Sequence, residues 1–184
     1  MKPWIGLFYL AALGLVGTAG PAASAQPPIV IKFSHVVAAD TPKGKASEFF
    51  KKRAEALTGG KVKVEVYANS TLYKDKEELE AVQLGVVQML APSLAKFGPL
   101  GVKEFEVFDL PYIFADYTEL HRITQGPVGA SILKKLESKG IVGLAYWDNG
   151  FKSFSANTPI HTPADLKGKK LRIQSSNVLE EEVR

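Results

Sequence analysis

Extended apolar segments and amphipathic helical segments alternate along the chain from Ile29 onward. Short runs rich in valine and isoleucine are typical of buried strands, and between them apolar residues recur at helical spacing. The pattern predicts three strands, at residues 29–35, 62–66 and 86–91, with a helix after each of the first two. This alternation favours an α/β sheet covered by helices over a β-sandwich or a helical bundle.

Local signals predict the ends of these two helices. Thr41 is suited to cap the first helix and Pro42 to occupy its first turn, and a Gly59-Gly60 pair follows its last apolar residue. We expect Asp75 to cap the second helix and Gly85 to adopt the left-handed conformation at its end. Together these signals predict a β-α-β-α-β unit.

The rest of the chain predicts a further set of elements. Apolar residues run from Phe105 to Phe114 and continue on one helical face as far as Ile123. We expect a helix at 127–139, a buried strand at 141–147 with an extended continuation at 151–156, a helical turn at 163–166, an apolar segment at 171–173 and a capped helix from 177. That last helix reaches Arg184 after about two turns without a C-cap, so we expect that the sequence is cut short.

Composition and charge then narrow the class of protein. Of the 184 residues, 46% are hydrophobic and 23% charged, which fits a soluble globular protein. The net charge is +4, but basic and acidic residues are interspersed, so nucleic acid is not an expected partner. The sequence has no cysteine, which excludes disulfides, cysteine-ligated zinc, iron–sulfur clusters and thiol catalysis.

The first 25 residues have the pattern of a cleavable secretory signal. Lys2 precedes an apolar run from Ile5 to Val16, and Ala23-Ser24-Ala25 offers the small residues that signal peptidase accepts. The apolar run is shorter than the ~20 residues that cross a bilayer, which argues against a membrane anchor. We therefore expect export to the periplasm and a mature protein that does not span the membrane.

Ordered blocks along the mature sequence resemble one known family. The blocks are Ile31-Lys32-Phe33-Ser34-His35, residues 72–79 (LYKDKEEL), Gly85-Val86-Val87-Gln88, Leu110-Pro111-Tyr112, Trp147-Asp148-Asn149-Gly150 and residues 166–172 (LKGKKLR). In this order they are similar to the periplasmic solute-binding subunits of TRAP transporters, and in particular to the C4-dicarboxylate-binding DctP type. Their number makes the resemblance more specific than any single motif.

The resemblance implies a two-lobed α/β protein with periplasmic-binding-protein-like architecture. Such a protein closes on an organic acid, needs no cofactor, and delivers the acid to a membrane permease driven by a sodium gradient. Residues 26–148 would form the first lobe, and residues 149–184 the hinge and the first part of the second lobe. Family members are normally much longer, so we expect that most of the second lobe is missing.

Two basic residues are candidates for binding the acid. An arginine fork can hold a carboxylate through two parallel hydrogen bonds, and Arg172 lies between Leu171 and Ile173. If that segment is a buried strand, Arg172 either points into a cleft or is a costly buried charge; the alternatives are a structural salt bridge or a solvent-facing side chain. The resemblance matches Arg172 to the family's carboxylate-binding arginine. It also places Lys152 as a second cation facing the ligand, although a lysine in such a segment is often simply solvated.

The first lobe offers two further candidates. Ser93 follows the third strand at its carboxyl end, where α/β folds bind ligands; a plain loop serine is the alternative. His35 ends the first strand just before a helix N-terminus, which favours an anion, or its ring is hydrogen-bonded to the backbone instead. We expect Lys43 to point to water. Trp147 either flanks the ligand or belongs to the core.

Other functions are less consistent with the sequence. A secreted enzyme acting on carboxylates is disfavoured, because the sequence has no Gly-x-Ser-x-Gly motif and its three histidines lack metal-ligand spacing. No paired catalytic carboxylates are evident, and we expect Glu77, Glu78 and Glu80 to lie on a solvated helix face. A receptor for an ATP-driven importer, a receptor for another carboxylate and an inert truncated copy also remain open.

Overall fold

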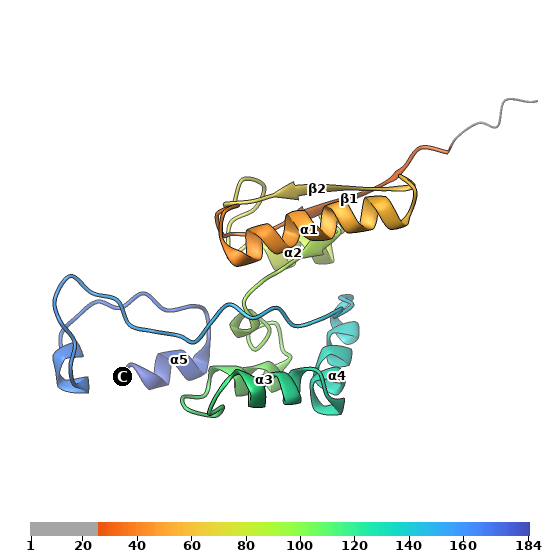
Figure 1. Cartoon of the computed structure of the whole chain (residues 1–184). Helices are drawn as coiled ribbons and strands as arrows, with labels where there is room; N and C mark the ends of the chain where they lie inside the picture. The colour runs from red at the N-terminus through yellow and green to blue at the C-terminus, as the bar shows by residue number, and fades with distance from the viewer. Residues whose placement is uncertain (1–25) are drawn as a thin grey trace, which may run out of the picture.

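The computed structural model describes residues 26–184 (Figure 1), so the predicted signal peptide lies outside the described residues. The strands are β1 (Ile29–Ser34), β2 (Val62–Tyr67) and β3 (Met89–Leu90). The α-helices are α1 (Pro42–Leu57), α2 (Glu78–Gln83), α3 (Tyr117–Thr124), α4 (Pro127–Lys134) and α5 (Asn177–Glu182). Short 3-10 helices are η1 (Leu94–Lys96), η2 (Lys103–Asp109), η3 (Lys135–Lys139) and η4 (Pro163–Leu166).

The three strands form a parallel sheet in the order β2-β1-β3. Ile29 of β1 lies opposite Val62 of β2, and Ser34 at the other end of β1 lies opposite Leu90 of β3. The chain passes through α1 to reach β2 and through α2 to reach β3. This confirms the predicted β-α-β-α-β unit and the α/β class.

Helix α1 covers this sheet, as Figure 1 shows. The Thr41 side chain accepts a hydrogen bond from the Gly44 amide at 3.2 Å, and Pro42 occupies the first turn, so the predicted start of the helix is confirmed. On the inner face, the Phe50 ring packs edge-on against the buried Phe33 of β1, with 5.9 Å between ring centroids. The helix is thereby fixed over the central strand.

The second helix and the third strand are shorter than predicted. The expectation that Asp75 caps α2 is wrong, because α2 begins at Glu78 and the residue at its cap position is Glu77. Strand β3 comprises only Met89 and Leu90 because the amides of the two preceding valines, Val86 and Val87, donate to the Ala81 carbonyl at the end of α2. Those amides complete the helix and are not available to a sheet ladder.

A second core lies under the helices that follow the sheet. Its buried side chains come from η1–η2 and from α4–η3: they are Phe97, Val102, Phe105, Ile132 and Leu136. The helix predicted at 127–139 is present, but it tightens into a 3-10 helix after Lys134 and ends at Gly140, whose φ is 74°. This core fixes α4, and Figure 1 shows α3 and α4 below the sheet.

The segment between η3 and α5 contains no strand. The prediction of a buried strand at 141–147 is wrong, because Val142 and Leu144 are exposed, and residues 151–156 are exposed and unpaired as well. The apolar segment at 171–173 is not a buried strand either, since Leu171 and Ile173 are only partly buried and Arg172 is exposed. A strand needs a neighbour that satisfies its peptide groups, and within residues 26–184 no chain segment pairs with these residues. The predicted turn at 163–166 is confirmed as η4.

Helix α5 is the last element of the described residues. Its first turn is capped as predicted, because the Ser176 hydroxyl accepts a hydrogen bond from the Leu179 amide at 3.4 Å. Among residues 26–184, no helix combines the length and the apolar character that a membrane crossing requires.

Candidate functional site

Three of the four predicted binding residues, His35, Ser93 and Arg172, lie near the carboxyl ends of β1 and β3. The chain leaves β1 toward β2 on one side and returns as β3 on the other, so the strand order reverses between β1 and β3. In α/β sheets, ligands bind outside the strand ends at such a switch point. We call this region the carboxyl edge; it comprises His35, Lys43, Asp75, Glu78, Ser93, Lys96 and Arg172.

His35 lies at this edge but is wholly buried. Its amide donates to the Tyr67 carbonyl at 3.0 Å, whereas neither ring nitrogen has a hydrogen-bond partner within the described part of the chain. Burial lowers the pKa of His35, and the positive charge of Lys43 lowers it further. The lowered pKa favours the neutral imidazole, which has one donor and one acceptor nitrogen.

Lys43 does not point to water as predicted. Its ammonium donates to the Ala91 carbonyl at 3.0 Å, directly beyond β3, and the residue is partly buried. Burial lowers the pKa of Lys43, and the nearby carboxylate of Glu78 opposes that shift. The first turn of α1 therefore brings a cation to the carboxyl edge.

The carboxyl edge also contains an ion-pair network that the sequence does not predict. The Lys96 ammonium contacts the Glu78 carboxylate and lies 2.6 Å from Asp75 Oδ1. Glu78 is wholly buried, so the prediction that it lies on a solvated helix face is wrong. Burial raises the pKa of Glu78, whereas Lys96 acts to lower it. Two segments that are 18 residues apart in the sequence are joined here.

Arg172 and Ser93 reach the same edge from distant parts of the sequence. An Arg172 guanidinium nitrogen lies 3.8 Å from Asp75 Oδ2, and the Arg172 side chain is 77% exposed. The Ser93 hydroxyl donates to Gln174 Oε1 at 3.1 Å, across 81 residues of sequence. Because the segment around Arg172 is not a buried strand, the guanidinium is neither buried nor unpaired. The alternative of an exposed, salt-bridged arginine describes this structure.

Lys152 and Trp147 lie in different surroundings. Lys152 pairs with the Asp109 carboxylate, which is buried at the end of η2. Within residues 26–184, no hydrogen bond or ion pair joins Lys152 to the other three predicted binding residues. Trp147 packs against Phe33, with 5.9 Å between ring centroids, so it contacts the core of the sheet.

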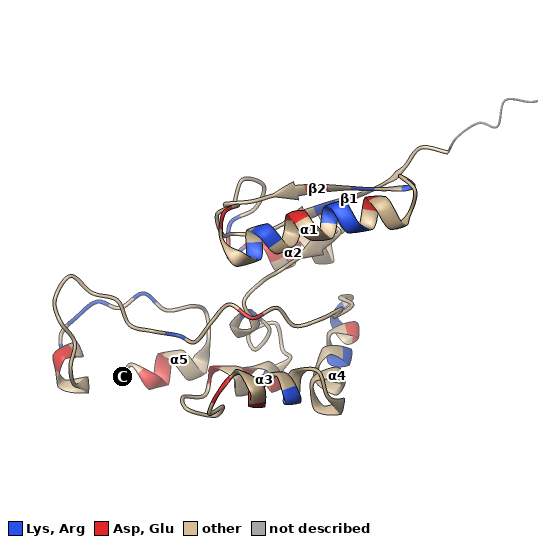
Figure 2. Ribbon diagram, viewed as in Figure 1, with Lys and Arg blue, Asp and Glu red and all other residues tan. Residues whose placement is uncertain are grey.

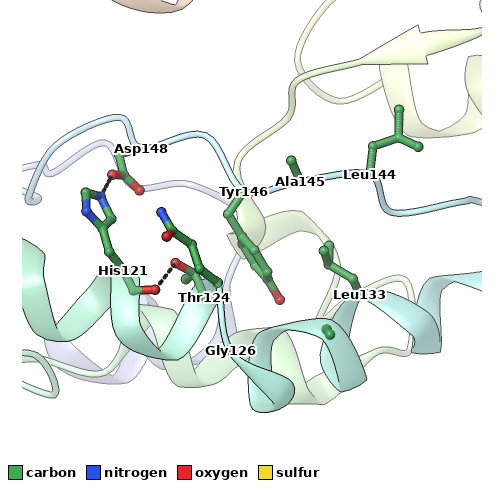
Figure 3. Close-up of a pocket in the computed structure, with 10 residues that line it drawn as sticks. His121, Thr124, Gly126, Leu133, Leu144, Ala145, Tyr146 and Asp148 are labelled. Atoms are coloured by element: carbon green, nitrogen blue, oxygen red, sulfur yellow. Dashed lines mark hydrogen bonds and ion pairs between the residues drawn. The ribbon is translucent and has the colours of Figure 1, made fainter.

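The described residues form two pockets in this part of the molecule. The first, of about 390 Å³, lies between α3, α4 and residues 144–148, and Figure 3 shows the His121 ring meeting the Asp148 carboxylate at one end of it. The four predicted binding residues do not line it. The second, of about 360 Å³, is lined by Gln174 and its neighbours up to Asn177, together with Lys76 beside Asp75. It adjoins the residues that Arg172 and Ser93 contact.

Charge is unevenly distributed around the site. Figure 2 shows basic positions along the segment between η3 and α5, where the basic residues are Lys152, Lys167, Lys169, Lys170 and Arg172. No cluster of three histidine, aspartate or glutamate side chains in residues 26–184 is placed to hold a metal ion. The arrangement suits the binding of an organic anion by side-chain cations and hydroxyls.

Comparison with known proteins identifies the family. Residues 33–184 match the model of the bacterial extracellular solute-binding protein family 7, DctP. The chain belongs to this family. A curated DctP relative, the C4-dicarboxylate-binding periplasmic protein DctP of Rhodobacter capsulatus, is 70% identical over 156 residues, which are 85% of this chain and 47% of the relative. Proteins of this family are solute-binding receptors.

Solved structures of DctP relatives confirm the fold. A TRAP periplasmic solute-binding protein of Pseudomonas aeruginosa with bound L-malate has a TM-score of 0.81 and 52% identity, and covers 85% of this chain and 54% of that one. A similar protein of Sulfurospirillum deleyianum with bound succinate has a TM-score of 0.81 and 46% identity, over 86% of this chain and 51% of that one. The chain thus spans about half the length of the relatives that it matches.

Proposed function

We propose that this DctP family chain forms the ligand-binding part of a periplasmic receptor for C4-dicarboxylates such as succinate, fumarate or malate. The receptor would deliver the acid to the membrane permease of a TRAP transporter for secondary active uptake. The first 25 residues would direct its export, residues 26–148 would form one lobe, and residues 149–184 would begin the other. The succinate and L-malate bound in two related structures support this substrate class.

The observation that carries the proposal is that Arg172 and Ser93 both lie at the carboxyl edge. Arg172 reaches the edge through Asp75 and Ser93 through Gln174, so residues from both predicted lobes contact one another at the switch point. Arg172 and Lys152 would bind the carboxylates from the second lobe, and Ser93 and His35 would donate hydrogen bonds from the first. The unpartnered ring of His35 supports its assignment.

The mechanism would be conformational, with no covalent step. An anion that contacts both lobes stabilises the arrangement in which the lobes are close, because it interacts more strongly with that state than with the open one. The permease would then recognise the closed surface. Since recognition uses side-chain cations and hydroxyl groups, the receptor would need no nucleotide, metal or redox group.

Calorimetric titration tests the proposal. Succinate, malate and fumarate are titrated into the chain lacking residues 1–25, into Arg172→Ala and into Arg122→Ala. The control is matched, because Arg122 is also an exposed arginine with one carboxylate 3.7 Å away, on Glu119. We expect binding by the unaltered chain and by Arg122→Ala, and loss of binding in Arg172→Ala. Heats of dilution alone for all three acids would contradict the proposal that this chain binds dicarboxylates.

A further inference from the structure

The Asp75 carboxylate lies between two cations of the proposed binding site. Its Oδ1 is 2.6 Å from the Lys96 ammonium, and its Oδ2 is 3.8 Å from the Arg172 guanidinium. A carboxylate of the protein therefore neighbours Arg172 where the proposed function requires a carboxylate of the ligand. Ser93, which is also predicted to bind the ligand, likewise has a partner within the protein, because its hydroxyl donates to the Gln174 side chain.

The two carboxylates of the edge differ in how firmly they are held. Glu78 is wholly buried against Lys96, so moving it would leave an uncompensated charge in the interior. Asp75 is 34% exposed, and its contact with Arg172 is the longer of its two contacts. An exposed pair of this length is weak, so Asp75 is the acidic group that Arg172 can exchange for a ligand.

The charge balance indicates the same exchange. Lys43, Lys96 and Arg172 bring three positive charges to the edge, against the two negative charges of Asp75 and Glu78. The surplus is a single positive charge, whereas a C4-dicarboxylate carries two negative charges at neutral pH. The negative charge of Asp75 therefore opposes the binding of a dianion at this edge.

We propose that Asp75 is an internal competitor of the ligand, which holds Arg172 while the site is empty and releases it when a dicarboxylate binds. This inference rests on the proposed function. Breaking the Asp75–Arg172 pair opposes binding by an amount typical of an exposed ion pair, which corresponds to roughly a two- to five-fold reduction in affinity. Removing the Asp75 charge should therefore tighten binding.

The test is titration of succinate into the unaltered chain, Asp75→Asn and Glu80→Gln at low ionic strength. Asparagine keeps the shape of Asp75 and removes its charge. Glu80→Gln removes the same charge from an exposed position of α2 and serves as the matched control. We expect Asp75→Asn to bind succinate roughly two- to five-fold more tightly and Glu80→Gln to bind as the unaltered chain does. The gain should shrink at high salt, because exposed charges are screened.

Two further variants separate competition from structure. Asp75→Ser, which also lacks the charge, should show the same gain and replaces Asp75→Asn if that variant does not fold. Asp75→Glu keeps the charge and should show no gain. Unchanged or weaker binding by the neutral variants, in a chain that binds succinate, would overturn the inference and leave the proposed function intact. No binding by any form, the unaltered chain included, would instead contradict the proposed function.

Discussion

Replacing Lys96 with methionine would leave a carboxylate without a partner in the interior of the carboxyl edge. Glu78 is wholly buried and Lys96 is 8% exposed, and the two side chains contact each other directly. Methionine has nearly the same length but no charge. Breaking a buried pair by removing one partner typically costs about 3–5 kcal/mol, out of a total stability of about 5–15 kcal/mol.

The loss of stability should depend on pH in a defined direction. Burial raises the pKa of Glu78 above its ordinary value of 4.5, and Lys96 opposes that rise. Without Lys96 the folded pKa rises further, so folding favours the protonated carboxyl more strongly than it does in the unaltered chain. The stability associated with the protonated form is fully present below pH 4.5 and is lost as pH rises through the folded pKa. The difference between Lys96→Met and the unaltered chain should therefore be large at pH 7 and shrink in acid.

Urea unfolding followed by circular dichroism at several pH values would measure this difference. Lys135→Met is the matched control, because Lys135 pairs with Glu104 at 2.9 Å while both side chains are half exposed, and its loss should cost no more than about 1 kcal/mol. The double variant Glu78→Gln/Lys96→Met should recover most of the stability. The reasoning would be refuted if Lys96→Met cost no more than the control, or cost the same at every pH.

Two other positions give predictions that depend on burial and close contact. Burial raises the pKa of Tyr146 to about 12, so ultraviolet titration should show one tyrosine that ionises near pH 12 and is absent from Tyr146→Phe. Alanine normally stabilises a helix relative to glycine, but a Cβ at Gly44 would lie 2.5 Å from the carbonyl oxygens of Ala38 and Ala39. Gly44→Ala should therefore lower the free energy of unfolding by about 1–3 kcal/mol in urea, and a gain in stability would contradict that clash.

The β-α-β-α-β unit could be predicted because its local signals and its tertiary packing agree. Thr41 and Pro42 define the start of α1, and Phe50 on its apolar face meets Phe33 of the central strand. The segment at 141–147 has an equally apolar sequence but forms no strand. Apolar pattern reports a preference for burial, whereas a strand also needs a hydrogen-bonding neighbour, and the pattern of one segment carries no information about that neighbour.

The carboxyl edge combines residues that the sequence singled out with charged residues that it did not. The rule that ligands bind at strand ends pointed to Ser93, and the geometry of carboxylate recognition pointed to Arg172. Glu78 and Lys96 were missed because charged residues are usually solvated. A signal for each was present: Glu78 shares the buried face of α2 with Ala81, and Lys96 lies within an otherwise apolar sequence at residues 94–97. Their pairing itself depends on tertiary structure and could not be read from either segment.

The cations of the carboxyl edge therefore have separable roles. Lys96 is held by a buried carboxylate and keeps its position whether or not a ligand is present, because releasing it would leave Glu78 unpaired. Arg172 is exposed and weakly paired with Asp75, so it can change partners at small cost. It follows that Lys96→Met should act mainly on the free energy of unfolding and Asp75→Asn mainly on the affinity for succinate. Lys96 and Arg172 both contact Asp75. Measuring the free energy of unfolding and the affinity for succinate in both variants would show whether Lys96 serves stability and Arg172 serves recognition.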